Sequence, residues 1–174
     1  IIHGSFGSSE GNWFPWLKEQ LEKDNKKVLV PQMPVGIDKQ NFDSWSEVLN
    51  KIAINEFTTI IAHSIAPILI CKYLITNKIK VKKLIFVCGF NNYFGINRDF
   101  DTVNGPLYID NYTDIKNYCD NIICYYSDND PYVKYEVEKE FASSISNKEY
   151  VIKGGGHINS ESGYTSFEAI LKSL

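Results

Sequence analysis

The sequence predicts an α/β protein: one domain, three layers (α/β/α), and a mostly parallel, six-stranded sheet. Short apolar segments alternate with helical segments of roughly 10–15 residues, the pattern of βαβ units. No repeat, low-complexity tract or Gly/Ser linker divides the 174 residues. We therefore expect residues 1–174 to fold around one core, with helices on both faces of the sheet.

Six segments are predicted to be strands because they are short, apolar and mostly β-branched or aromatic. They are 1–2, 28–30, 58–62, 83–87, 121–126 and 149–152. The first ends at His3-Gly4, and the second is closed by Pro31, which has no amide hydrogen to donate to a ladder.

Five segments are predicted to be helices because their apolar residues recur at helical spacing. They are 13–24, 43–54, 65–76, 132–143 and 164–174. In the first, Trp13, Leu17 and Leu21 share one face, and Pro15 falls in the first turn, where its missing donor costs little.

Residues 89–118 interrupt this alternation. The stretch is rich in Asn, Asp, Gly, Tyr and Phe and has no sustained period. A loop of this length inside a compact domain is more often functional than not. We interpret it as a minimal, cap-like loop with a short helix near 113–119.

Charge and cysteine content exclude several classes of function. The net charge is −3 and the basic residues are dispersed, which argues against nucleic acid as the main partner. No apolar run approaches the roughly 20 residues of a membrane span. The four cysteines show no CxxC pair and no zinc spacing, so we expect a reducing, cytoplasmic location. We also expect no metal and no cofactor. Because the chain begins at Ile1, we expect a short N-terminal piece to precede it.

The sharpest motif is IIAHSIA, residues 60–66, in which a predicted strand turns directly into a helix. A serine on such a turn stands clear of the sheet, and Ser64 is the candidate nucleophile. Small neighbours are needed there. The usual glycines are replaced by Ala62 and Ala66, which are small but less suited to a positive φ. Alternatively, Ser64 is simply the N-cap of the helix.

A serine nucleophile needs a base, and the chain has three histidines. His63 adjoins Ser64, so its side chain should point away from the reacting face. His3 ends the first predicted strand, where we expect it to brace the following loop. His157 follows three glycines after the last strand, which lets its loop bend back over the sheet. By elimination, His157 is the predicted base.

The partner of His157 is sought after the penultimate strand, in SDNDPYV, residues 127–133. Asp130 precedes Pro131, which favours an extended backbone, and is the preferred candidate. Asp128 is the alternative, and it would otherwise cap the turn. The resulting chain order of Ser, Asp and His is that of α/β hydrolases.

An oxyanion hole is predicted beside the elbow. In a doubly wound sheet, the loop after the first strand lies next to the strand that carries the nucleophile. The backbone amides of Ser5 or Phe6 would then join that of Ile65. A phosphate-binding loop is the alternative, but the glycines here lack the G-x-G-x-x-G register and a P-loop lysine. Aromatic residues could wall an acyl pocket, although they are as often core: Phe6, Trp13, Phe90, Tyr93 and Phe94.

Several motifs together resemble one family. HG after the first strand, WFPWL, the P-x-M-P of 31–34, Trp45, AHSIA, SDNDPYV and GGGHIN are similar to the small YdeN-like serine hydrolases, relatives of the retinoblastoma-binding-protein-nine family. The resemblance covers nearly the whole chain. It implies a minimal α/β-hydrolase fold without a large cap and a triad of Ser64, Asp130 and His157.

We therefore expect a carboxylesterase that forms an acyl-enzyme from small ester or related acyl substrates. Two interpretations remain open beside it. One is an acyltransferase, and the other is a hydrolase-like fold that mainly binds a protein partner, although no sequence feature points to such a partner.

Overall fold

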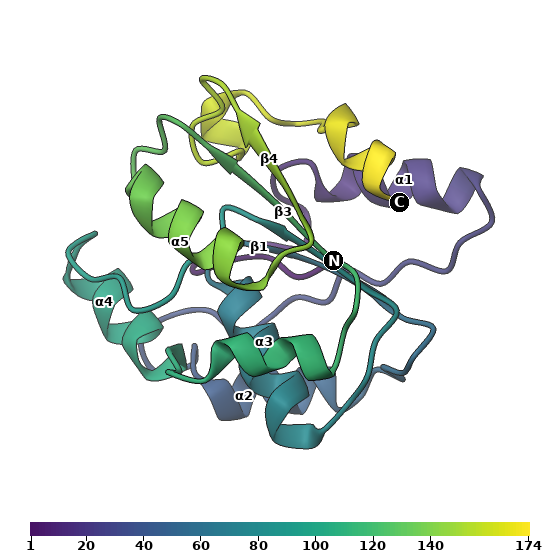
Figure 1. The fold of residues 1–174 in the computed structure, drawn as a ribbon, viewed down its shortest axis with the longest axis horizontal. Helices are drawn as coiled ribbons and strands as arrows, with labels where there is room; N and C mark the ends of the chain where they lie inside the picture. The colour runs from purple at the N-terminus through teal and green to yellow at the C-terminus, as the bar shows by residue number, and fades with distance from the viewer.

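Four parallel strands form the sheet of the computed structural model, which describes all of residues 1–174 (Figure 1). They are β1 (Thr59–His63), β2 (Lys83–Val87), β3 (Ile122–Ser127) and β4 (Lys148–Ile152). They pair in the order β1-β2-β3-β4, with Ala62 opposite Phe86 and Phe86 opposite Cys124. Because the strands are parallel, their carboxyl ends share one edge, and the loops that carry Ser64, Asp130 and His157 meet there.

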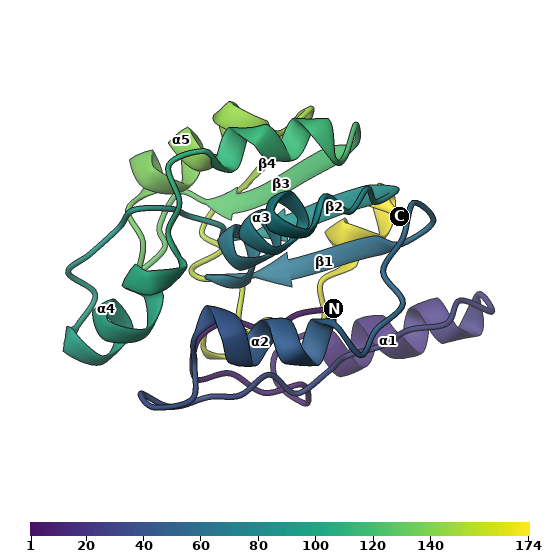
Figure 2. The same ribbon diagram turned by 90° about the horizontal axis from the view of Figure 1, so that it is seen from below.

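Helices cover both faces of this sheet (Figures 1 and 2). On one face lie α2 (Phe42–Leu49), α3 (Ala66–Asn77) and α5 (Tyr135–Ile145), which share a core of 28 buried residues. On the other lie α1 (Phe14–Lys23) and a 3₁₀ helix, Glu168–Ser173, over a cluster of 13 buried residues. The predicted α/β class, with a parallel sheet between helices, is confirmed.

The predicted number of six strands is wrong, because two of the segments do not form ladders. Ile2 makes a single bridge to Ala62: its amide donates to the Ile61 carbonyl at 2.8 Å. Residues 28–30 pair with no strand, although the amino group of Ile1 donates to the Leu29 carbonyl. Residues 1–2 lie beside β1 as expected, and residues 28–30 contact Ile1, but each segment makes too few backbone bonds to extend the sheet.

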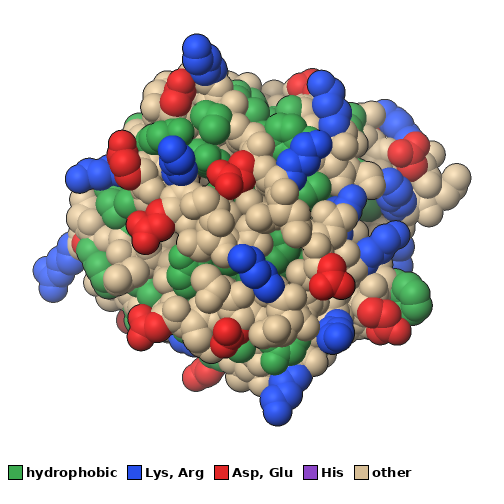
Figure 3. All heavy atoms as spheres, in the orientation of Figure 1, with side chains coloured by type: hydrophobic (Ala, Val, Ile, Leu, Met, Phe, Trp, Pro, Cys, Tyr) green, Lys and Arg blue, Asp and Glu red, His purple; other side chains and the backbone are tan.

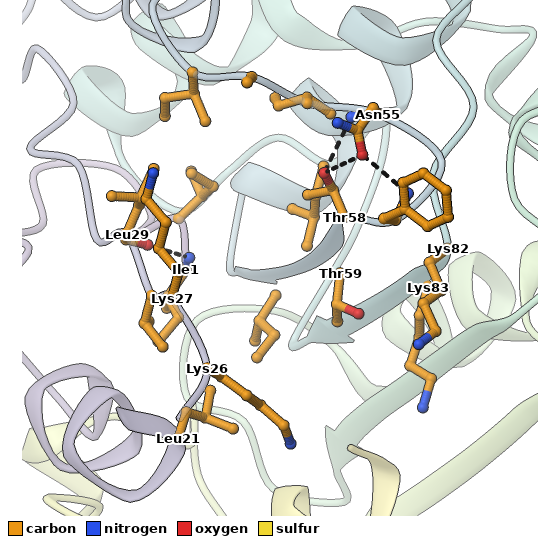
Figure 4. A pocket seen from close by; sticks show the side chains of 18 of the residues that line it. Ile1, Leu21, Lys26, Lys27, Leu29, Asn55, Thr58, Thr59, Lys82 and Lys83 are labelled. Carbon is orange, nitrogen blue, oxygen red and sulfur yellow. Dashed lines mark hydrogen bonds between the residues drawn. The ribbon is translucent and has the colours of Figure 1, made fainter. Parts of the chain in front are cut away.

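A cavity of about 520 Å³ lies where these two segments pass β1. Figure 4 shows Leu29 and Ile1 on one side of it and Thr58 and Thr59 on the other. Apolar side chains and a few lysines line it, Lys83 among them. The amino-terminal half of β1 therefore faces this cavity on the side away from β2, and not another strand.

Three predicted helices differ in kind or extent. The predicted helix 132–143 is α5, which begins only at Tyr135 because residues 131–133 form a bend. The predicted helix 164–174 is instead the 3₁₀ helix 168–173, held by bonds such as Ile170 N–H to the Phe167 carbonyl. The predicted helix 43–54 is α2, which ends at Leu49 because residues 50–52 continue as turns.

The predicted cap-like loop 89–118 contains short elements. It holds α4 (Arg98–Asn104) and the 3₁₀ helices Gly105–Leu107 and Tyr112–Asn117. The last lies close to the helix expected near 113–119, but it is 3₁₀. The Asn97 side chain caps α4 by accepting the amides of Asp99 and Phe100.

The structure shows where the cysteines and the charged side chains lie. All four cysteines are buried and unpaired. No helix has the length and apolarity needed to cross a bilayer. On the face shown in Figure 3, basic and acidic side chains are interspersed and do not gather into one patch.

Because residues 28–30 lie outside the sheet, their amide hydrogens should exchange faster than those of β2. The amides of 28–30 donate to no backbone carbonyl, whereas β2 is bonded on both sides. We expect 28–30 to exchange at least about a hundredfold faster than the central residues of β2. Exchange of both segments at the same slow rate would restore 28–30 to the sheet.

Candidate active site

Ser64 occupies the sharp turn between β1 and α3 with a left-handed backbone, φ +65°. Its amide donates to the Val87 carbonyl on β2 at 2.9 Å, which fixes the turn against the sheet. Ala62 and Ala66 are fully buried, and neither has a positive φ. The strained conformation thus falls on the serine itself, so small alanines suffice where glycines are usual.

Gly4 brings the loop after Ile2 against this turn. A Cβ atom on Gly4 would lie 2.6 Å from Ser64 Cβ and 3.2 Å from the His63 carbonyl oxygen. No side chain fits in that space, so glycine is required by close approach. The predicted proximity of the loop to the elbow is therefore present, although residues 1–2 form no strand.

His157 reaches Ser64 from the loop after β4. Its Nε2 lies 3.0 Å from Ser64 Oγ. The preceding Gly156 has φ +56°, a conformation that a larger residue adopts only with strain. The Asn129 side chain accepts the Gly156 amide, and Ser127 Oγ donates to the Gly156 carbonyl. The loop is thereby tied to the end of β3.

Asp130 meets the other nitrogen of the ring. His157 Nδ1–H donates to Asp130 Oδ2 at 2.5 Å, while Oδ1 accepts the amides of Tyr132 at 2.7 Å and Val133 at 3.0 Å. Burial alone would raise the pKa of Asp130, but the bond from His157, its charge and the two amides together lower it below its usual value. Asp128 instead accepts the Gly154 amide.

The bond to Asp130 sets the proton positions on His157. With its hydrogen on Nδ1, the ring leaves a lone pair on Nε2 facing the Ser64 hydroxyl. Ser64 Oγ–H can therefore donate to His157, and the charge that follows is compensated by Asp130. This arrangement can move a proton from the serine to the imidazole.

The other two histidines are structural supports. Burial lowers the pKa of His63 to about 3, so its ring is neutral, and its Nε2–H donates to the His157 carbonyl at 2.9 Å. His3 Nε2 accepts the Met33 amide, and its Nδ1–H donates to the Gly4 carbonyl. This contact between His63 and the backbone of His157 was not predicted from the sequence.

The predicted oxyanion donors are not equivalent. The Phe6 amide already donates to Gln40 Oε1 at 3.1 Å. The amides of Ser5 and Ile65 have no protein acceptor, and Ile65 is the N-cap of α3. Of the two alternatives, Ser5 is therefore the amide left for a ligand. Its Oγ is held between Gln40 and Asn104, two buried residues that sequence reasoning missed.

A cavity of about 300 Å³ opens beside Ser64. Its apolar lining comes from Phe6, Phe90, Ile96, Phe100 and Val133, and its polar lining includes Asn12, Tyr132, Asn159, Ser160 and Glu161. Because Ile96 and Phe100 belong to residues 89–118, the short cap supplies one wall.

Three of the five aromatic residues expected in this lining lie elsewhere. Trp13 is fully buried in the core under α1, where Nε1–H donates to the Ile158 carbonyl. Tyr93 packs against the core on the α3 face, and Phe94 is 54% exposed with its ring on Tyr108. Phe6 and Phe90 do line the cavity.

One cluster of side chains has the composition of a metal site. Atoms of Cys88, Asp130, Glu138 and His157 all lie within 4.8 Å of one another. Burial raises the pKa of Cys88 well above its usual value and that of Glu138 to about 9. Both groups therefore hold protons at neutral pH, which opposes their use as ligands.

Comparison with known proteins shows the family and the fold of the chain. The family model described as serine hydrolase matches residues 1–174. YdeN of Bacillus subtilis is 26% identical over 98% of this chain and 90% of its own length. Its crystal structure superposes with a TM-score of 0.84 at 25% identity, covering 99% of this chain and 93% of that one. A YdeN-like hydrolase structure from Pectobacterium atrosepticum shares the fold, with a TM-score of 0.66 at 15% identity over 100% of this chain and 86% of that one.

The contact between Gly4 and the elbow gives a direct test of the site geometry. In Gly4→Ala, the added methyl group must push Ser64 or the Ser5 amide away. We expect kcat/KM for p-nitrophenyl acetate to fall by about a hundredfold, the loss that a misplacement near 1 Å can cause.

Gly11→Ala is the matched control, since its Cβ would meet only ordinary contacts, the nearest at 3.4 Å. Circular dichroism should show both variants folded. Wild-type activity in Gly4→Ala would contradict the close approach.

Proposed function

The chain belongs to the serine hydrolase family, and we propose that it hydrolyses small carboxylic esters through Ser64, His157 and Asp130. One observation carries this proposal: a continuous hydrogen-bonded chain runs from Ser64 Oγ through His157 to Asp130 at the wall of the 300 Å³ cavity. The order of the three residues along the sequence supports it as well.

In the proposed first half-reaction, His157 Nε2 takes the proton of Ser64 Oγ as the oxygen attacks the ester carbonyl. The amides of Ile65 and Ser5 hold the oxyanion that develops. His157 then gives its proton to the leaving alcohol, and Ser64 remains acylated. Asp130 stays ionised throughout and stabilises the imidazolium form of His157.

In the second half-reaction, a water molecule replaces the alcohol. His157 takes a proton from it, and the resulting hydroxide attacks the acyl carbonyl. Collapse of the second tetrahedral intermediate returns the proton to Ser64 and releases the acid. A general base contributes about 10²–10⁴ in rate, and one oxyanion donor about 10²–10³.

The cavity supports small substrates. Its volume of about 300 Å³ is at the lower end of ligand pockets, which span roughly 300–1,000 Å³. In its lining, Phe90 and Phe100 offer apolar contact for a short acyl chain. Asn12 and Ser160, also in the lining, offer hydrogen bonds to a polar leaving group.

Substitution of the three residues tests the mechanism. Ser64→Ala should abolish hydrolysis of p-nitrophenyl acetate. His157→Ala should lose at least about a hundredfold in kcat, and Asp130→Asn about 10³–10⁴-fold because the ring loses its orienting partner. Asp128→Asn should keep most of the activity, since the Asp128 side chain bonds to the Gly154 amide and not to His157. Equal losses in Asp128→Asn and Asp130→Asn would overturn the choice of acid.

The size of the cavity predicts a dependence on acyl chain length. Across p-nitrophenyl esters, kcat/KM should be highest for the acetate and butyrate and fall for the octanoate. Phe100→Ala should enlarge the cavity and move the optimum to longer chains. Phe94→Ala, on the same short cap but outside the lining, should leave the optimum in place. Parallel shifts in both variants would show that the lining does not set the preference.

A further inference from the structure

Glu138 lies on α5 next to the site and is fully buried. Neither of its carboxyl oxygens accepts a hydrogen bond in the contacts of the folded chain. A buried carboxyl group without a partner is uncommon, because burial removes its hydration and nothing replaces it. The position of Glu138 therefore calls for a physical reason.

The groups around Glu138 come from three other loops of the site. Cys88 follows β2, Asp130 follows β3 and His157 follows β4, and their polar atoms and the Glu138 carboxyl lie within 4.8 Å of one another. No lysine or arginine pairs with Glu138. On α5 itself, the adjacent Lys139 is directed at the Tyr135 ring.

An ionised Glu138 would place a second buried negative charge beside Asp130 with no cation to stabilise it. The Cys88 thiol and the Ser127 backbone lower the pKa of Glu138, but burial and Asp130 raise it by more. Two carboxyl groups that share such a site do not both ionise at neutral pH. Asp130 is the one that is stabilised as an anion, by His157 and two backbone amides. Glu138 therefore keeps its proton.

Asp130 has room for one further donor. A carboxylate offers about four lone-pair positions. Oδ2 accepts from His157, and Oδ1 accepts from the amides of Tyr132 and Val133. The remaining position on Oδ2 is left for a neutral donor nearby, and the Glu138 hydroxyl is the strongest such donor in the cluster.

Resting on the proposed function, we propose that Glu138 is a positioning residue of the same site. Its carboxyl group keeps its proton and donates it in a hydrogen bond to Asp130 Oδ2. Asp130 is thereby held as the acceptor for His157 Nδ1. A donor on the carboxylate also makes Asp130 less basic, so the His157 imidazolium gives up its proton more readily. Burial, with the charge of Asp130 as the second cause, raises the pKa of Glu138 to about 9, in agreement with a neutral side chain.

The acid limb of the pH profile of kcat/KM reports the pKa of the proposed base, His157, and tests this role. Glu138→Leu removes the donor, so Asp130 holds the imidazolium proton more tightly. We expect the acid limb to move up by about half a pH unit, with kcat reduced and KM little changed. Glu138→Gln keeps a neutral donor, so its acid limb should match the wild type and its kcat should exceed that of Glu138→Leu.

Two other roles of Glu138 predict different shifts of the acid limb. If Glu138 were ionised, both variants would remove a negative charge and lower the acid limb. If it served only in packing, Glu138→Leu would leave the limb unmoved. Either result overturns the proposal. Glu140→Leu, an exposed position on the same helix, is the control for a general effect of the substitution.

A second measurement does not depend on catalysis. With a pKa of 4.5 in the unfolded chain and about 9 in the folded one, Glu138 binds more protons when folded between these values. Its contribution to stability is therefore fully present below pH 4.5 and is lost as pH rises to about 9. The Tm of Glu138→Gln should accordingly rise relative to the wild type across this range.

A Tm difference that stays constant with pH would overturn the protonated state, even if Glu138→Leu does not fold. The two proposals can also fail separately. If Ser64→Ala retains esterase activity, the proposed function fails, while the pH dependence of Tm still decides whether Glu138 is neutral.

Discussion

The left-handed backbone of Ser64 is the constraint on which the site depends. A non-glycine residue at φ +65° costs on the order of 1–3 kcal/mol and persists only where its surroundings enforce it. Here the Val87 carbonyl holds the amide of Ser64, and Gly4 packs against its Cβ from the other side. The turn keeps Ser64 Oγ within reach of His157 and leaves the Ile65 amide free at the start of α3.

Around this turn, loops that are far apart in sequence are joined by hydrogen bonds. Ser127 and Asn129 hold Gly156, and Asp128 holds Gly154, so the loop after β4 is fixed to the end of β3. The His63 ring donates a hydrogen bond to the His157 carbonyl. Residues that do not touch a substrate thus set the distances between those that would. In the same way, Asn104 connects the Ser5 loop to the short cap, and Gln40 connects it to the loop before α2.

The sequence was sufficient where local chemistry decides the structure. The β-branched and apolar run 83–87 predicted β2 with its exact bounds, and the IIAHSIA motif predicted the strand-to-helix turn. The sequence was insufficient where the structure of a segment depends on pairing with another segment. Residues 28–30 have the composition of a strand, yet they pair with none.

The residues around the site could not be predicted either, because they are brought together only by contacts between distant segments. Glu138 looks like a solvent-facing position on a helix, because only the fold brings β2, β3 and β4 against it. Trp13 looked like a pocket aromatic, whereas its long-range bond to Ile158 places it in the core. The preference for Asp130 over Asp128 could be argued from Pro131, but the amides that hold Asp130 are visible only in the structure.

The central claim is that Ser64 is a nucleophile activated by His157. Mass spectrometry of the folded protein after treatment with a fluorophosphonate tests it most directly. We expect one adduct per chain, located on Ser64 and much slower to form in His157→Ala. A folded protein that remains unmodified, or an adduct on another residue that persists in Ser64→Ala, would contradict it.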